Sequence, residues 1–178
     1  MGRYHEALDQ VASAVEQDPL NVLFRGVFAL ILGLESPDRS LAEARTAMEL
    51  DATHWLPYYA ISLYHFRRGE LPLALQFAER SLRGPLALPA GLSAGLLRRL
   101  GQNDRADELL SRLTAPNGRF IYHILCADLD AAADALERSL TEGTVQSLMW
   151  LPYFLEPLRA TPRWPALAKM MNLPPEAV

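Results

Sequence analysis

The residues whose types could support catalysis or metal binding are scattered along the chain. The four histidines are His5, His54, His65 and His123, and no two have the i, i+4 spacing of a zinc site on a helix. The segment HEALD at 5–9 lacks the second histidine of a zinc protease. No nucleophile elbow, phosphate loop or dinucleotide fingerprint occurs in the sequence. The sequence therefore predicts no enzyme, no metal site and no cofactor.

The remaining reactive side chains have simpler structural interpretations. Cys126 is the single cysteine, so it has no internal disulfide partner, and its apolar surroundings favour a buried small side chain over a reactive thiol. Asp128, Asp130 and Asp134 lie at the start of a predicted helix, where capping and the helix dipole explain them. His65 falls on a predicted core stripe, which favours a core or rim histidine over a ligand.

Composition indicates a folded, helical, soluble chain. Half of the residues are apolar and 21% are charged, and the net charge of −4 argues against binding of nucleic acid by this chain. The most apolar run, VFALILGL at 27–34, is about half as long as a membrane span requires. With no signal peptide in view, we expect a cytoplasmic protein. Arginine is much commoner than lysine (Lys169 is the only lysine), which fits a bacterial, GC-rich source.

The positions around which helices must be arranged are small residues that recur about every 33 residues. The first series is Ala7, Ser40, Ala74, Ala106 and Ala132, and the second is Ala14, Ala47, Ser81 and Ser139. The unit at 55–82 is the clearest, because both of its halves carry apolar residues at i, i+3, i+4 and i+7. Gly69 supplies the left-handed residue between the two predicted helices, and Pro72 fits the first turn of the second. The pattern predicts about five consecutive helical hairpins, the first without its leading helix.

This spacing resembles the tetratricopeptide repeat over roughly residues 2–141. The residues that carry the resemblance are Gly2, Tyr4, Ala7, Ala14 and Pro19; Ser40, Ala47 and Asp51; Tyr58, Ile61, Gly69, Ala74 and Ser81; and Gly101 and Ala106. The resemblance implies an all-α fold, a right-handed superhelical array of antiparallel helical hairpins. Ala52 and Phe28 depart from the family pattern. Gly91 and Gly95 weaken one predicted helix, and either close backbone packing or degeneracy of the repeat explains them.

The tail at 151–174 resembles the proline-rich end of many bacterial tetratricopeptide proteins. Phe154, Pro157, Leu158, Arg159, Pro162, Arg163, Trp164, Leu167 and Leu173 carry the match. A repeat array needs a terminal element to cover its last apolar face. We therefore expect a repeat array over residues 1–142 and a capping segment over 143–178 that packs on it.

The chain begins at the turn before the second helix of a hairpin. Either it is a C-terminal piece of a longer protein, which we favour, or the gene starts there. The uncovered flank of the first predicted helix then predicts association, either with an upstream segment or with a second copy as a homodimer.

The resemblance also implies where a partner would bind. The family's ligand-facing positions, carried across, are Arg25, Leu56, Tyr59, Leu63, Phe66, Arg67, Arg98 and Arg99. This set is apolar and aromatic in its middle with arginines at its edges, which suits a peptide segment that is apolar with acidic flanks. Alternatively, Tyr59, Leu63 and Phe66 pack between neighbouring units.

Three hypotheses for function follow. The first is a scaffold or adaptor module that binds a protein or peptide segment in a concave groove. The second is a C-terminal sensory or regulatory domain of a larger signalling protein, such as a winged-helix transcription regulator. The third, which we rank well below the others, is an enzyme with an unrecognised site between hairpins.

Overall fold

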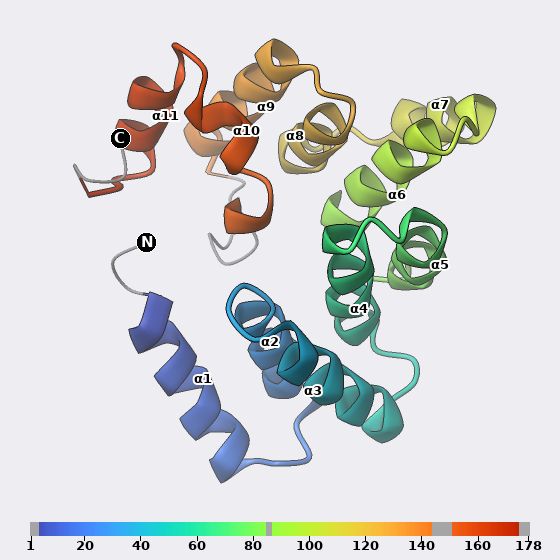
Figure 1. Cartoon of the computed structure of the whole chain (residues 1–178), viewed down its shortest axis with the longest axis vertical. Coiled ribbons are helices and arrows are strands. Elements are labelled where there is room, and N and C mark those ends of the chain that lie inside the picture. The colour runs from blue at the N-terminus through green and yellow to red at the C-terminus, as the bar shows by residue number, and fades with distance from the viewer. Residues whose placement is uncertain (1–3, 85–86, 144–150, 175–178) are drawn as a thin grey trace. The chain divides into compact units, whose positions relative to one another are not determined.

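The computed structural model describes residues 4–84, 87–143 and 151–174, which form helices and connecting turns without any strand. The chain divides into two compact units, residues 3–85 and residues 86–178. They are called the N-terminal unit and the C-terminal unit here, and Figure 1 labels their helices. The all-α class predicted from the sequence is confirmed.

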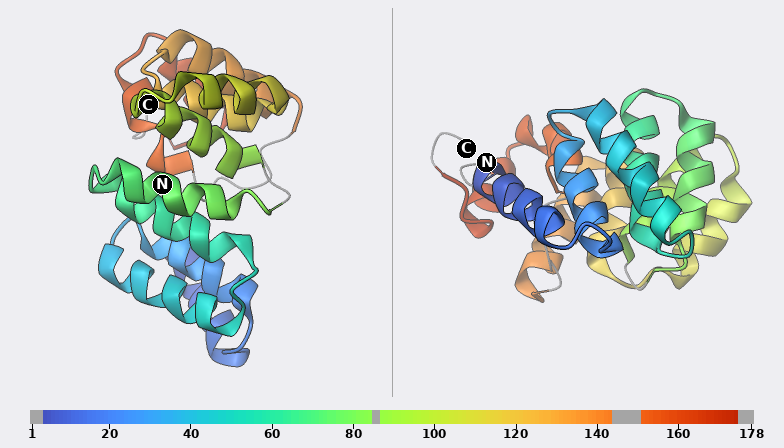
Figure 2. Two further views of the ribbon diagram at one scale, coloured as in Figure 1. Left: turned by 90° about the vertical axis from the view of Figure 1, so that its right-hand side faces the viewer. Right: turned by 90° about the horizontal axis from the view of Figure 1, so that it is seen from below.

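The N-terminal unit contains one lone helix followed by two helical hairpins. Its elements are α1 (Tyr4–Gln17), α2 (Val22–Leu32), α3 (Pro37–Leu50), α4 (Trp55–Arg67) and α5 (Leu71–Ser81). Within this unit α2 packs against α3 and α4 against α5, while α1 packs against α2 (Figures 1 and 2). By its place in the repeat pattern α1 corresponds to the second helices α3 and α5, and the truncation of its hairpin stays a prediction.

The ends of these helices follow the local signals in the sequence. Asn21 caps α2 with its side-chain oxygen, which accepts a hydrogen bond from the Phe24 amide at 3.2 Å. Pro37 and Pro72 occupy the first turns of α3 and α5, where a missing N–H costs nothing. Gly69 connects α4 to α5 with a φ of 73°, in the left-handed region that a glycine adopts without strain.

Small residues allow the two helices of each hairpin to approach closely. The Ser62 hydroxyl on α4 donates a 2.7 Å hydrogen bond to the Ala74 carbonyl on α5. The Ser40 hydroxyl on α3 donates a bond of the same length to the Ala29 carbonyl on α2. Residues at these crossings have no exposed surface, and they include Ala44, Ala47, Ala74, Ala78 and Ser81. A larger side chain at such a position would push the helices apart.

The C-terminal unit contains two more hairpins and a terminal segment. Its elements are α6 (Ala87–Arg99), α7 (Asn103–Arg112), α8 (Pro116–Leu125), α9 (Leu129–Thr141), a 3-10 turn at Leu151–Tyr153, α10 (Glu156–Arg159) and α11 (Trp164–Met170). Within this unit α6 packs against α7, and α8 packs against both α9 and α6. Asp128 caps α9 by accepting a hydrogen bond from the Ala131 amide, as its position at the helix start predicts.

Glycines bring α6 and α8 together at the distance of backbone contact. A Cβ atom at Gly91 would lie 2.0 Å from the Gly118 carbonyl oxygen, and one at Gly118 would lie 2.6 Å from the Ala87 carbonyl oxygen. A Cβ at Gly95 would lie 2.6 Å from Cβ of Leu125. Of the two explanations that the sequence leaves open for Gly91 and Gly95, close backbone packing is confirmed.

The terminal helices α10 and α11 lie against α9 and bury large apolar side chains. Trp164 and Leu167 are 3% and 1% exposed, and Phe154 before α10 is equally buried. Arg163 pairs with Asp134 and, at 2.6 Å, with Glu137, both on α9. This segment covers one side of the α9 helix, and the domain boundary between residues 142 and 143 stays a prediction.

No helix in the described ranges is both long and apolar enough to cross a membrane.

Candidate partner-binding surface

Five of the predicted partner-binding residues lie on α4, and their exposure changes along the helix. The residues near the start of the helix are buried, whereas the residues near its end are accessible. Leu56 is 3% exposed, Tyr59 and Leu63 have no exposed surface, Phe66 is partly exposed, and Arg67 is exposed. The accessible part of this predicted surface is therefore the C-terminal end of α4.

Leu56 takes part in the packing of α4 against α2. A Cβ atom at Gly26 would lie 2.8 Å from Cδ2 of Leu56, so the Leu56 side chain would have to shift to admit a larger residue at that contact. Gly26 itself is buried. The side chain of Leu56 thus packs closely between the first helices of two successive hairpins.

Arg25, the predicted residue on α2, is held by groups of the same unit. Its Nη1 atom lies 2.6 Å from Oε2 of Glu43 on α3, and its Nε donates a 2.6 Å hydrogen bond to the Pro19 carbonyl. The side chains of Arg25 and Glu43 are 17% and 27% exposed. This ion pair joins α2 to α3.

Arg67 reaches from the end of α4 to the end of α2. Its guanidinium donates to the Gly33 carbonyl, and a longer contact of 3.4 Å joins it to the Leu34 carbonyl. The last carbonyls of a helix lack intrahelical donors and carry partial negative charge. Arg67 therefore satisfies the C-terminus of α2 and links two hairpins, a role that the sequence pattern does not reveal.

Arg98 and Arg99, the last two predicted residues, belong to the C-terminal unit. Arg98 donates from Nε to the Tyr122 hydroxyl at 3.2 Å and pairs with Asp107. The Tyr122 hydroxyl, followed by the Asp107 carboxylate, raises the pKa of Arg98 above its ordinary value. Arg98 thus joins α6 to both α7 and α8, and Arg99 beside it is exposed. The structure groups the predicted residues by unit, six in the N-terminal unit and these two in the C-terminal unit.

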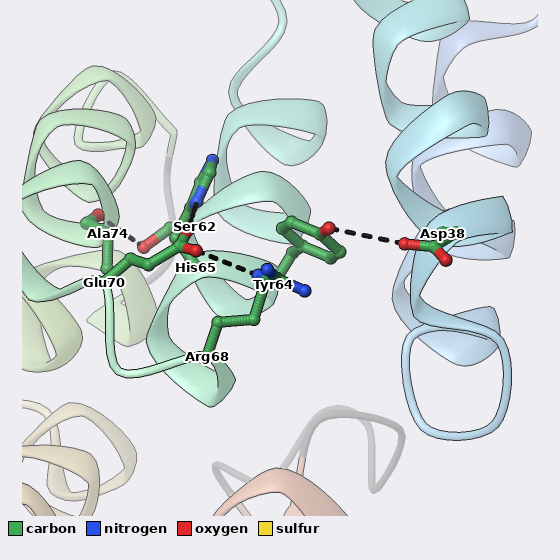
Figure 3. Close-up of polar contacts among 7 residues, drawn as sticks. All are labelled: Asp38, Ser62, Tyr64, His65, Arg68, Glu70 and Ala74. Carbon is green, nitrogen blue, oxygen red and sulfur yellow. Dashed lines mark hydrogen bonds and ion pairs between the residues drawn. The ribbon is translucent and has the colours of Figure 1, made fainter.

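A polar cluster that sequence reasoning missed surrounds the turn between α4 and α5 (Figure 3). Nδ1 of His65 lies 2.6 Å from Oε2 of Glu70, and Nε of Arg68 lies 2.9 Å from Oε1 of the same carboxylate. The hydrogen bond from His65, and then the one from Arg68, lowers the pKa of Glu70 below its ordinary value. The Tyr64 hydroxyl contacts Asp38 of α3 at 3.4 Å. The cluster closes one hairpin and ties it to the preceding one.

The same pairing of a histidine with an acid five residues later recurs at the turn between α8 and α9. Nδ1 of His123 lies 3.6 Å from Oδ2 of Asp128. Burial lowers the pKa of His123, and the Asp128 carboxylate partly offsets that shift. The turn residue is Ala127, which has a φ of 57° where the earlier hairpin has Gly69. The signal was present in the sequence as His-x4-acid across each turn.

Cys126, next to this turn, is partly buried, and burial raises the pKa of its thiol. Because the thiolate is the reactive form, this environment disfavours nucleophilic chemistry at neutral pH. Across the described ranges, no three His, Cys, Asp or Glu side chains gather where they could hold a metal ion. The clusters present bridge neighbouring helices, which is typical of a helical scaffold.

Hairpins of this kind, joined by small residues and by polar contacts between successive helices, define a helical-repeat fold. No protein-family model and no curated protein matches the chain. Among solved structures, the chain is similar to the crystal structure of MamA, with a TM-score of 0.50 and 18% identity over 88% of each chain. At this identity the likeness shows the fold, which is that of a tetratricopeptide-like helical repeat.

Proposed function

We propose that the chain is a non-catalytic scaffold or adaptor module that binds a segment of a protein partner through its repeat surface. The observation that carries this proposal is the fold of consecutive hairpins, which is shared with MamA. A rigid surface made of several helices binds an extended or helical segment without a large rearrangement. The proposal includes the cytoplasmic location and bacterial source expected from the sequence.

We place the partner segment at the C-terminal end of α4. Phe66 is partly exposed there, and Arg67 and Arg25 are cations on the same unit. Leu56, Tyr59 and Leu63 are buried on the same helix. Such an arrangement suits an apolar segment with acidic flanks, because an aromatic anchor contributes most of the binding energy and arginine pairs with carboxylates.

A displayed peptide library tests this assignment. The library carries a random apolar core between runs of Asp and Glu, and enriched peptides are measured by calorimetry. Phe66→Ala is expected to weaken binding at least tenfold, since truncating an aromatic residue that dominates an interface costs about 2 kcal/mol or more. Arg45→Gln, an exposed position on α3, serves as the control and should leave affinity unchanged. Equal affinity of the Phe66→Ala variant and the parent chain would place the partner elsewhere.

Self-association through α1, expected from the sequence, remains a prediction. Light scattering over a concentration series distinguishes a monomer of 19.8 kDa from a dimer. Self-association would be independent of peptide binding at α4, because the two surfaces share no residue.

A further inference from the structure

The helix α7 buries fewer residues than α3, α5 and α9, which occupy the same place in their hairpins. Its single buried residue is Ala106, and Leu109 and Leu110 are partly exposed. The helix α5 has a similar length and buries Ala74, Leu75, Ala78 and Ser81. A helix that buries few side chains opens at a lower free energy than the helices around it. By this measure α7 is held more weakly than its counterparts.

The neighbours of α7 in the C-terminal unit are also fewer. It packs mainly against α6, whereas α9 packs against α8 and against the terminal helices α10 and α11. In the N-terminal unit α3 packs against both α2 and α4. Because the elements of a repeat protein are stabilised by their nearest neighbours, α7 depends on its contact with α6.

The crossing of α6 and α7 lacks the hydroxyl bonds found at the crossings of the N-terminal unit. There, Ser62 of α4 and Ser40 of α3 each donate to a carbonyl of the partner helix. Ala94 of α6 lies 32 residues after Ser62, and the same spacing relates Ala74 to Ala106. Ala106 in turn occupies the place that Ser40 has in α3. Alanine has no side-chain donor, so neither hydroxyl bond has a counterpart between α6 and α7.

A polar contact that does join α6 to α7 is the ion pair of Arg98 with Asp107. The two side chains are 31% and 61% exposed. An ion pair with this much access to solvent contributes little stability. The contact therefore does not make up for the small buried area of α7.

The residues that flank α7 differ in how firmly they are held. Gly101 before the helix has a φ of 75°, and a Cβ atom there would have no neighbour within 4 Å. Leu113 after the helix is 4% exposed, and its carbonyl accepts a 2.8 Å hydrogen bond from Nε of Arg119 on α8. Its Cδ1 atom would lie 2.7 Å from a Cβ at Gly118. Leu113 is thus anchored to α8 independently of α7.

We propose that α7 is a displaceable helix, which leaves α6 while Leu113 and the other helices of the C-terminal unit stay packed. Opening takes Asp107 away from Arg98, whereas the Tyr122 hydroxyl on α8 still accepts the 3.2 Å bond from Nε of Arg98. The guanidinium is then available to another carboxylate. Since Arg98 is one of the residues predicted to contact a partner, α7 regulates its availability. That consequence rests on the proposed function, and the opening itself does not.

Hydrogen exchange read by mass spectrometry on the full chain, without any partner, tests the opening across a series of low urea concentrations. The amides of residues 107–112 should exchange about tenfold faster or more than those of α6 and α8, after correction for intrinsic rates. Their exchange should also depend weakly on urea, because opening of one helix exposes little surface. Equal protection and equal urea dependence in α6, α7 and α8 would overturn the proposal.

Two substitutions test the contact between α6 and α7. Asp107→Asn removes the ion pair with Arg98 and should speed exchange in α7 up to about threefold. Ala94→Ser places a hydroxyl where α4 has Ser62 and should slow exchange in α7 about threefold or more. Neither should change exchange in α9.

Glu108→Gln is the matched control, because it removes the same charge beside Asp107 while its partner Arg112 lies on α7 itself. It should leave the exchange of α7 close to that of the parent chain. An Asp107→Asn variant that speeds exchange in α6 and α8 as much as in α7 would show that α7 does not open separately. No acceleration by Asp107→Asn together with no slowing by Ala94→Ser would likewise overturn the proposal.

Discussion

At the scale of single residues, polar side chains close the turns between helices and fix neighbouring hairpins. His65 and Glu70 do this at the turn between α4 and α5, and His123 and Asp128 repeat the pairing between α8 and α9. The two turns differ in their left-handed residue, which is Gly69 in one and Ala127 in the other. Because a side chain in that region costs roughly 1 kcal/mol, the second turn is held against a small backbone strain.

The Glu70 carboxylate gives this arrangement a pH dependence whose sign follows from its pKa. Hydrogen bonds from His65 and Arg68 lower that pKa in the folded chain, so the stability they contribute is present above the ordinary glutamate value. It is lost as the pH falls through the lowered value. We expect Glu70→Gln to lower the melting temperature at neutral pH, and expect the difference from the parent chain to shrink in acid.

Thermal melts in a series of buffers from neutral to acidic measure this difference. Glu49→Gln, at an exposed position on α3, is the control and should track the parent chain throughout. A Glu70→Gln variant that matches the parent chain at neutral pH would show that the hydrogen bonds at this turn contribute no stability.

At the scale of helices, the crossing of α6 and α8 depends on the absence of side chains. Alanine in place of a helical glycine ordinarily stabilises a helix by roughly 0.5–1 kcal/mol. Gly91→Ala is expected to do the opposite, because the new methyl group would lie 2.0 Å from the Gly118 carbonyl oxygen. Forcing the helices apart costs about 1–3 kcal/mol or more. Urea unfolding of the full chain measures the change.

A suitable control for that variant is Ala90→Gly, a partly exposed position of the same helix. It should destabilise the chain by about 1 kcal/mol through helix propensity alone. If Gly91→Ala raised the free energy of unfolding, the close approach of α6 and α8 would be wrong.

The helices and their pairing were predictable because they rest on local and periodic signals. Gly69, Pro37 and Pro72 mark helix ends, and Ser40 and Ala74 recur where helices cross. The contacts that fix hairpins to one another were not predictable in the same way. The bond from Arg67 to the Gly33 carbonyl joins residues 34 apart, and its acceptor is a backbone atom that has no signature in the sequence.

The absence of sequence signals for contacts between hairpins also explains why the burial of the candidate surface residues was not predictable. The family pattern places Tyr59 and Phe66 on one stripe of α4, yet it says nothing about how deeply each is buried. Tyr59 is fully buried and Phe66 is partly exposed, because exposure depends on what packs over each part of the helix. A partner role for these residues stays a prediction.

At the scale of the whole molecule, the division into two units predicts that a destabilising substitution in one unit leaves the other unit folded. Trp164 is buried in the C-terminal unit against the terminal part of the array, and truncating a buried tryptophan costs about 3–5 kcal/mol. In a repeat protein each hairpin is stabilised mainly by its neighbours. We expect Trp164→Ala to increase amide exchange in α8 and α9 and leave α2 to α5 protected.

Hydrogen exchange read by mass spectrometry follows each helix separately. Met170→Ala on the same short helix is the control, since that side chain is 43% exposed and should alter exchange little. Equal loss of protection in both units would mean that they unfold together.

The bond between Arg67 and the end of α2 also constrains how an acidic ligand can be recognised. A carboxylate that drew the guanidinium away would leave the Gly33 and Leu34 carbonyls without their donor and would loosen the joint between two hairpins. Water would have to replace the guanidinium as the donor to these carbonyls. Part of the favourable energy of ligand binding would then only offset the loss of the two internal bonds. A ligand that left both of these bonds in place would keep the joint between the two hairpins intact.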